Sequence, residues 1–385
     1  KFCTMKKSLI ALSLGTLGLG IAEFVMMGIL PDVAKALQID ISTAGHFISA
    51  YALGVCLGAP ILLFARKMPP KRILEGLVCL MFAGNLCAFL SPGYYSLLFS
   101  RLLSGLPHGA YFGVASIVAS KLASQGKSAE AVSIMIAGMT IANLFGVPLG
   151  TSLSHNLSWR LPFLLVSGWS LIVFYGIWKW VPAIEGVEDT GFKGQFRFLK
   201  RPEPWLILGA TALGNGGAFC WYSYISPLLT QVSGFRPVSL SFLMILAGFG
   251  MVAGNLASGR LSDRFGAAKM GTMFQALIGV VSLCLFFFSP YALPAVLLMC
   301  FGTAGLFAVS APEQLLIIKV AKGGEMLGAA SVQMAFNLGN AIGAYAGGLV
   351  VNADLRYPAL MALPFCLAGF SCFLLFYKKY SRNYG

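Results

Sequence analysis

The sequence predicts an all-α membrane protein, with twelve transmembrane helices in two pseudo-symmetric bundles of six. Three observations support this fold class: the composition, the apolar segments along the chain, and an internal repeat. Of the 385 residues, 58% are hydrophobic and 10% are charged, and the mean hydropathy is +0.81. Because globular chains carry roughly 25% charged residues, these values exclude a soluble domain, a disordered tail and a secreted disulfide scaffold.

The apolar segments are long enough to cross a bilayer, which requires about 20 residues each. They lie near 8–30, 41–65, 72–91, 94–120, 129–154, 161–181, 204–231, 237–259, 268–289, 291–318, 325–351 and 357–377. The polar stretch between the sixth and seventh segments is the longest in the chain. We therefore predict an N-terminal bundle at 1–183, a cytoplasmic linker at 184–203 and a C-terminal bundle at 204–385.

Basic residues follow the loops of this topology. The formal net charge is +14, and all but five of the 27 Lys and Arg residues fall on the side of the membrane where both termini lie. The five exceptions are Lys35, Arg101, Arg160, Arg236 and Arg356. Since cytoplasmic loops carry the Lys and Arg excess, we expect both termini in the cytoplasm and no nucleic-acid partner.

The two halves of the chain repeat a pattern of glycines. At an offset of 196 residues, Gly54 falls on Gly250 and Gly58 on Gly254, each at the same place in its half. Such repeats are typical of transporters. We therefore predict two six-helix halves in the same orientation, related by an axis along the membrane normal.

The loop after the eighth segment reads Gly259-Arg260-Leu261-Ser262-Asp263-Arg264-Phe265-Gly266. It resembles the signature loop of the major facilitator superfamily, in its drug:proton antiporter type. The copy after the second segment keeps Arg66, Lys71 and Arg72 but has Ala65 and Met68 where the family has Asp and Gly.

Further motifs extend the resemblance over essentially the whole chain. Arg101 is followed by Gly105 and Gly109, and the fifth segment contains Gly146-Val147-Pro148-Leu149-Gly150. The passages 20–24, 107–109 and 322–330 resemble the AraJ-like (arabinose) sugar-efflux branch.

The resemblance implies a proton-coupled antiporter that exports a small organic molecule, such as a sugar or a drug, by rocker-switch alternating access. It implies a multi-pass monomer in the bacterial inner membrane, with lipid, protons and the substrate as partners. The proton gradient supplies the energy, so no cofactor is expected. It also implies conformational gating by the two loops and the fifth segment; these residues are Arg66, Lys71, Arg72, Gly259, Asp263, Arg264, Gly266, Gly146, Pro148 and Gly150.

Two charged residues lie deep in apolar segments. An acid at the bilayer centre costs about 2.5–3.5 kcal/mol on insertion scales, so it persists where it faces a cavity, has a partner or is protonated. We expect Glu23 and Arg101 to couple proton movement to transport. The alternatives are an interhelical hydrogen bond for Glu23 and packing for Arg101, whose expected partner is Glu23 or a backbone carbonyl.

Other polar residues are candidates for proton relay or substrate binding. His46, His108 and Glu313 are relay candidates, with interhelical hydrogen bonds or a cytoplasmic-side contact as alternatives. Three amides at spacings of 4 and 3 share one face of the eleventh segment, which must face the bundle interior. The candidates for substrate binding, with helix–helix hydrogen bonding as the alternative, are Asn215, Trp221, Tyr222, Tyr224, Gln333, Asn337 and Asn340.

Several function classes receive no support. The sequence has no Gly-x-Ser-x-Gly, Walker or His-Glu-x-x-His motif, and its nine cysteines form no CxxC pair, so we expect no catalytic residues and no metal site. A uniporter or a proton-symporting importer remains the alternative within transport. A receptor or a membrane enzyme is the alternative outside it.

Overall fold

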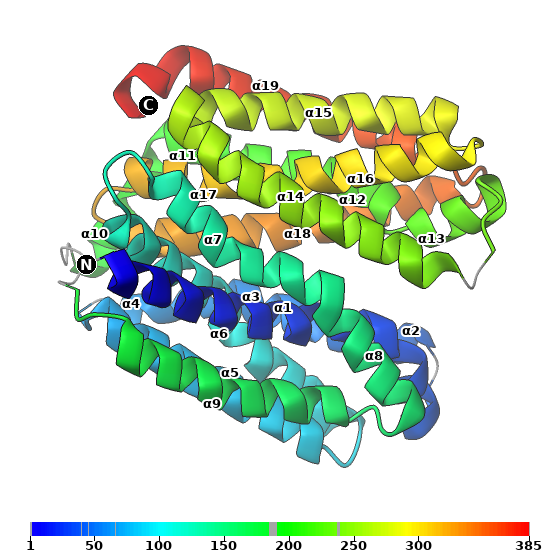
Figure 1. Cartoon of the computed structure of the whole chain (residues 1–385), viewed down its shortest axis with the longest axis horizontal. Coiled ribbons are helices and arrows are strands. Elements are labelled where there is room, and N and C mark those ends of the chain that lie inside the picture. The colour runs from blue at the N-terminus through cyan, green and yellow to red at the C-terminus, as the bar shows by residue number, and fades with distance from the viewer. Residues whose placement is uncertain are drawn as a thin grey trace. The chain divides into compact units, whose positions relative to one another are not determined.

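The computed structural model describes residues 2–39, 41–44, 46–65, 67–184, 191–236 and 239–384, and these residues form helices without any strand (Figure 1). The all-α fold class is therefore confirmed. In the first part of the chain the helices are α1 (Phe2–Leu37), α2 (Ile41–Ala44), α3 (His46–Gly58), α4 (Ile61–Ala65), α5 (Pro70–Leu90), α6 (Tyr94–Leu122), α7 (Ser128–Ile141), the π-helix η1 (Ala142–Gly146), α8 (Val147–Asn156), α9 (Leu161–Trp180) and α10 (Gly191–Gln195).

The second part of the chain contains the remaining helices. They are the 3₁₀ helix η2 (Arg197–Lys200), α11 (Pro202–Gly209), the π-helix η3 (Ala210–Gly214), α12 (Asn215–Tyr222), α13 (Ile225–Pro227), the π-helix η4 (Leu228–Val232), α14 (Leu240–Phe265), α15 (Ala267–Phe288), α16 (Ala292–Ala308), α17 (Ser310–Val320), α18 (Glu325–Val351) and α19 (Tyr357–Tyr384).

Eleven helical segments among the described residues are long and apolar enough to cross a membrane. The twelfth segment predicted, 204–231, is not one continuous helix, because it is divided among α11, η3, α12, α13 and η4. Ser223 and Tyr224 interrupt it as a turn, and the backbone of Tyr224 leaves helical geometry with φ −116° and ψ 18°. The expected position of this segment stands, whereas its continuity was wrong.

The chain divides into two compact units by its contacts. Unit 1 comprises Lys1–Ser124, Ile134–Arg197 and Lys322–Met334, and unit 2 comprises Gln125–Ser133, Phe198–Ala321 and Ala335–Gly385. Each unit holds most of one predicted bundle. The first residues of α7 belong to unit 2, and the first residues of α18 belong to unit 1. The two units therefore differ from the predicted bundles, which were separated only by the linker at 184–203.

The glycine repeat forms equivalent helix–helix contacts in the two units. In unit 1, glycines of α3 lie against backbone carbonyls of α6, and a Cβ atom at either glycine would overlap them. In unit 2, α14 approaches α16 in the same way. The pairs are Gly54 with Leu102, Gly58 with Leu106, Gly250 with Cys300 and Gly254 with Ala304. The repeat read from the sequence is therefore a repeat of backbone packing.

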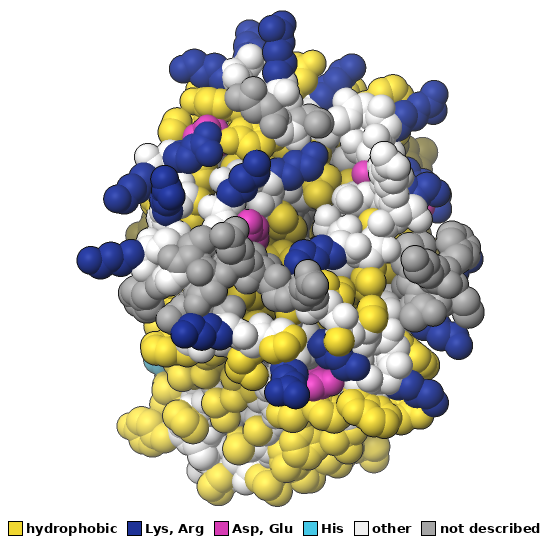
Figure 2. All heavy atoms as spheres, turned by 90° about the vertical axis from the view of Figure 1, so that its left-hand side faces the viewer, with side chains coloured by type: hydrophobic (Ala, Val, Ile, Leu, Met, Phe, Trp, Pro, Cys, Tyr) yellow, Lys and Arg dark blue, Asp and Glu magenta, His cyan; other side chains and the backbone are white. Residues whose placement is uncertain are grey.

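The surface combines apolar helix sides with basic helix ends. Large apolar side chains such as Phe64 (83% exposed), Tyr345 (72%) and Leu293 (69%) stand outward, which in a membrane protein is the surface that lipid covers. Figure 2 shows Lys and Arg side chains, in dark blue, spread over one face of the molecule among fewer Asp and Glu side chains. This distribution fits basic loops beside a membrane.

Candidate functional site

A buried arginine forms the centre of the polar cluster in unit 1, where α1, α3 and α6 pack together (Figure 1). Arg101 on α6 has no exposed surface, and its Nη1 donates to the backbone carbonyl of Ala22 at 2.7 Å. Its Nε donates to the carbonyl of Phe47 at 3.4 Å. The guanidinium also stacks 4.5 Å from the centre of the Tyr51 ring. Of the two partners expected for Arg101, the backbone carbonyl is the one it bonds.

Glu23 and His108 lie close together beside this arginine. Glu23 on α1 is 6% exposed, and its Oε2 lies 3.7 Å from Nε2 of the fully buried His108. The other imidazole nitrogen, Nδ1, lies 2.9 Å from the hydroxyl of Tyr51, and that hydroxyl also donates to the carbonyl of Leu19 at 3.3 Å. The cluster thus connects a carboxyl, an imidazole and a phenol across three helices.

The Tyr51 hydroxyl contacts both the Leu19 carbonyl, at 3.3 Å, and His108 Nδ1, at 2.9 Å. Which atom donates in the contact with His108 depends on the tautomer of the imidazole. On the other side of the ring, Nε2 faces Glu23 Oε2 at 3.7 Å, and these two buried atoms form no hydrogen bond among the described residues.

The sequence did not single out Tyr51 as a candidate, whereas it grouped His46 with His108 as a relay candidate. His46 is exposed at the start of α3, and its Nδ1 lies 2.7 Å from the hydroxyl of Tyr94. It therefore joins no contact described for the buried cluster. Tyr51 falls in an apolar segment, and its lone hydroxyl was the available signal for a buried hydrogen bond.

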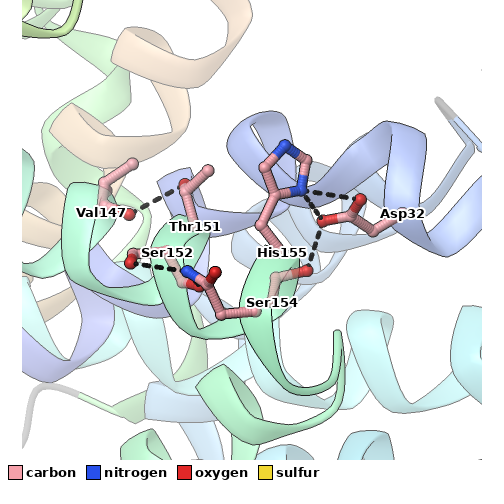
Figure 3. A network of polar contacts seen from close by, with 7 residues as sticks. Asp32, Val147, Thr151, Ser152, Ser154 and His155 are labelled. Carbon is pink, nitrogen blue, oxygen red and sulfur yellow. Dashed lines mark hydrogen bonds and ion pairs between the residues drawn. The ribbon is translucent and has the colours of Figure 1, made fainter.

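A second polar network of unit 1 lies where the end of α1 meets α8 (Figure 3). The Asp32 carboxylate accepts a hydrogen bond from Ser154 Oγ at 2.6 Å and lies 2.9 Å from His155 Nδ1. His155 itself is 64% exposed. His155 is therefore a surface histidine with a carboxylate partner from α1, a pairing that was not predicted from the sequence.

Unit 2 contains one deeply buried carboxyl in a neutral setting. Glu313 on α17 is 1% exposed and therefore lies in the interior of unit 2. Gln275 Nε2, on α15, lies 3.5 Å from Glu313 Oε1. Thr211 and Asn215 also face this carboxyl. Gln275 was missed, although it is a lone amide within an apolar segment.

Two of the aromatic candidates for substrate binding make contacts within unit 2. Trp221 is 2% exposed and donates through Nε1 to Ser282 Oγ at 3.1 Å. Tyr224 donates to the carbonyl of Ala344 at 2.8 Å. These bonds join helices, as the structural alternative proposed. Tyr222 is half-buried.

The amides of α18 differ in exposure. Gln333 and Asn337 are 7% and 6% exposed, and Asn340 is half-buried. The spacing thus places amides on the inner side of a helix whose Leu338 stands outward at 54% exposure. Their role in binding a substrate stays a prediction.

The expected signature loop is mostly helical, because Gly259–Phe265 form the last turns of α14 and only Gly266 lies outside the helix. This signature loop caps the start of α7. The Asp263 carboxylate accepts hydrogen bonds from the backbone N–H groups of Ala129 at 2.9 Å and Glu130 at 2.8 Å. Arg260 Nε donates to Glu130 Oε1 at 3.1 Å. A Cβ at Gly259 would lie 2.6 Å from that of Ser133, so glycine permits this close approach. The loop therefore binds a helix N-terminus, where the helix dipole favours a carboxylate.

The remaining loop residues have separate surroundings. Gly266 ends α14 and begins α15 with φ +89°, a conformation that favours glycine. The Arg264 guanidinium lies 5.1 Å from the centre of the Phe265 ring. In unit 1, Lys71 Nζ donates to the carbonyl of Trp178 at 2.6 Å. Arg66 lies outside the described residues, and Arg72 is exposed near the start of α5.

Comparison with known protein families identifies the superfamily of this chain. The family model of the Major Facilitator Superfamily matches residues 12–332. The chain belongs to this superfamily. Its members are transporters and not enzymes, which agrees with the absence of a catalytic motif in the sequence.

Relatives within the superfamily match nearly the full chain. The chain is 46% identical to the Putative transporter AraJ of Escherichia coli strain K12 over 382 residues, covering 98% of this chain and 97% of the relative. It is 36% identical to the Inner membrane transport protein YdhP of the same strain, covering 96% and 95%. A crystal structure of the Major Facilitator Superfamily transporter FucP in the outward conformation has a TM-score of 0.78, 16% identity, and coverage of 95% and 98%. This last similarity shows the fold.

Two of the glycines predicted to act in gating pack against α1 within unit 1. Gly146 and Gly150 face Ile21 and Val25 of α1 in unit 1, and a Cβ at either glycine would lie 2.5 Å from the facing side chain. Pro148 is in the first turn of α8, directly after η1, where its missing N–H costs little. These contacts describe close packing, and a gating role for the three residues stays a prediction.

No metal centre is formed by the described residues, because no three His, Cys, Asp or Glu side chains gather in a way that could hold an ion. The described cysteines are all free thiols. Two of them are fully buried, four are half-buried, and Cys79 and Cys87 are exposed.

Proposed function

We propose that this chain is a proton-coupled antiporter that exports a small organic molecule through the membrane. The observation that carries the proposal is the buried Glu23, which faces His108 at 3.7 Å beside the guanidinium of Arg101. A carboxyl in that setting exchanges a proton more readily than it holds a permanent charge. Proton uptake at Glu23 then changes the charge of the cluster by one unit.

That change of charge supplies a physical link to conformation. A neutral Glu23 turns an O–H toward Nε2 of His108, 3.7 Å away, whereas an ionised Glu23 is attracted to Arg101 instead. Since the three residues lie on α1 and α6, the switch alters the forces between these two helices. Export follows where one state of the cluster favours the outward-open form and the other the inward-open form.

We propose that the cargo is neutral or amphipathic, as sugars and many drugs are. The candidates for its site are the amides of α18 and the aromatic Tyr222, because amides form hydrogen bonds and rings stack on sugar faces. Asn337 and Asn340 are the amides we assign first to cargo binding. Thermal-shift screening of the purified protein with sugars, nucleosides and cationic drugs identifies the class.

The function is tested in liposomes loaded with a pH-sensitive dye. In the presence of a cargo found by the screen, wild-type protein should move protons against cargo, and Glu23→Gln should abolish this coupled movement. Glu75→Gln is the matched control, since it removes a carboxyl from α5 that is half-buried in the same unit. Coupling of wild-type size in Glu23→Gln would refute the proposal.

The same assay separates the alternatives within transport. A uniporter moves cargo without responding to the pH gradient, and a symporting importer moves protons and cargo in the same direction. The FucP structure is related by fold alone, so its own coupling carries no argument for this chain. Cargo movement opposite to proton movement is the result expected here.

We propose the bacterial inner membrane as the location, with both termini in the cytoplasm. The spanning helices and the inner membrane relative YdhP support the membrane, and the basic loops support the orientation. Labelling of a cysteine at Lys378 in intact cells should require membrane permeabilisation. Labelling by an impermeant reagent without permeabilisation would reverse the orientation.

A further inference from the structure

Glu313 differs from every other described acid of unit 2. Glu203 lies 2.6 Å from Arg201, and Asp354 lies 2.7 Å from Arg356. Glu130 faces Arg260, and Asp263 accepts two backbone N–H groups of α7. Glu313 is the one with neither a cation nor a backbone donor among the residues described, and it is 1% exposed. It is therefore a buried carboxyl with no fixed charge to balance it.

The groups around Glu313 are neutral amides with unused hydrogen-bonding capacity. Gln275 Nε2 lies 3.5 Å from the carboxyl and 3.2 Å from the carbonyl of Ala210. The Oε1 atom of Gln275, and both Oδ1 and Nδ2 of Asn215, are buried without a hydrogen-bond partner among the described residues. Because buried polar atoms are normally paired, these three atoms are available to pair with the Glu313 carboxyl when the side chains rotate.

Amides complement both forms of a carboxyl. Their NH₂ groups donate to a carboxylate, and their C=O groups accept from a carboxylic acid. Gln275 and Asn215 thus offer partners before and after a proton binds, with only rotation of side chains. An arginine or lysine in their place would favour the ionised form alone.

The backbone positions these amides with a distorted helix. Thr211 lies on the π-helix η3, and Asn215 begins α12 directly after it. A Cβ at Gly214 would overlap the side chain of Gln275, so glycine leaves the space that this amide occupies. Single π turns are frequent at functional sites because they redirect side chains.

Charged groups on the neighbouring elements are engaged elsewhere. The side chains that face Glu313 are Thr211 from η3, Asn215 from α12 and Gln275 from α15. Among the described residues, α11, α14, α16 and α19 contribute no titratable group that interacts with it. On α17 itself, Lys319 donates to the carbonyl of Tyr384 at 2.9 Å. A proton is the partner that neutralises this carboxyl without any other change.

We propose that Glu313 is a second proton-binding site, located in unit 2 and independent of Glu23, with Gln275 and Asn215 as its partners in both protonation states. The carboxylate takes one proton from water and forms one O–H bond, and the reverse step returns it. The use of this proton in export rests on the function proposed above, whereas the binding itself does not. The transporter then carries one exchangeable carboxyl in each unit.

Infrared difference spectroscopy tests the site without any transport measurement. Full-length protein in lipid is stepped through pH, and the C=O band of protonated buried carboxyls is recorded for wild type, Glu23→Gln, Glu313→Gln and the double variant. We expect each single variant to lose about half of the titrating band and the double variant to lose nearly all of it. A band in Glu313→Gln equal to that of wild type would overturn the proposal.

A second variant keeps the test decisive if Glu313→Gln does not fold. In the Glu23→Gln background, Gln275→Leu removes the Nε2 donor that lies 3.5 Å from the remaining carboxyl. A hydrogen bond to a charged group is stronger than one to a neutral group, so the carboxylate loses more than the acid and the proton affinity should rise by about tenfold. An unchanged titration would count against the amide partnership. Exchange of choline chloride for sodium chloride at fixed pH should leave the band unaltered, and its loss in sodium would assign the site to a metal cation instead. A normal infrared result together with failed antiport would refute the proposed function alone.

Discussion

The contact of Asp263 with the first turn of α7 allows a worked prediction. Its carboxylate accepts two backbone hydrogen bonds, at 2.9 and 2.8 Å, from Ala129 and Glu130. A hydrogen bond to a charged group contributes about 1.5–3 kcal/mol. Because Asp263 is half-buried, we discount the pair to about 2–4 kcal/mol for Asp263→Ala, and to about half of that for Asp263→Asn, which retains one acceptor.

Hydrogen exchange of the peptide 125–133 measures this contribution directly. With about 1.4 kcal/mol per factor of ten, Asp263→Ala should accelerate exchange at the start of α7 by roughly 30- to 700-fold, and Asp263→Asn by roughly 5- to 30-fold. Asp354→Asn, which removes another carboxylate of unit 2 in a different turn, should leave this peptide unchanged. Exchange in Asp263→Ala at the wild-type rate would refute the assignment of the signature loop as a helix cap.

Two further predictions concern single positions outside the proton sites. Gly266→Ala should lower the melting temperature in detergent by several degrees, because a side chain at φ +89° costs about 1–3 kcal/mol. The control is Gly76→Ala on α5, where an added Cβ meets no atom within 4 Å, and this change should be neutral or stabilising. Equal effects of the two substitutions would contradict the strain argument. Hydrogen bonds from Arg356 hold the pKa of Asp354 below its ordinary value, so its stabilisation is present above pH about 4 and is lost as the pH falls through the lower folded value. Asp354→Asn should therefore melt earlier than wild type at pH 7, by a difference that narrows as the pH falls below about 4. A difference that stays constant between pH 7 and pH about 3 would exclude this linkage.

The sequence predicted well those features that depend on local composition. Apolar length and basic loops located the helices, and the cost of a buried charge singled out Glu23, Arg101 and Glu313 from their positions in apolar segments. The partners of these residues could not be placed in the same way. Which residue faces Glu313 depends on the rotation of α15 and α17 against each other, and a spacing along one helix does not fix that rotation.

The continuity of the seventh segment shows the same limit. Its apolar composition is sufficient to span, yet π turns and the turn at Ser223 and Tyr224 divide it. Tyr224 gains an interhelical bond to Ala344 there, so tertiary contacts outweigh local helix preference. A sequence window of apolar residues contains no information about such a bond.

The two units share their backbone packing but not their chemistry. Gly54 and Gly58 correspond to Gly250 and Gly254. The first pair lies against backbone carbonyls of α6, and the second pair lies against backbone carbonyls of α16. The polar residues have no such counterparts: the offset of 196 places Phe219 opposite Glu23, and it places Ile117 and Cys79 at the positions that correspond to Glu313 and Gln275.

This asymmetry separates two kinds of constraint on a duplicated fold. Close helix contacts require a small residue wherever two backbones meet, so the duplicated geometry requires glycine twice. A buried carboxyl requires only one favourable setting, and each unit supplies a different one: Arg101 and His108 surround Glu23, whereas neutral amides surround Glu313.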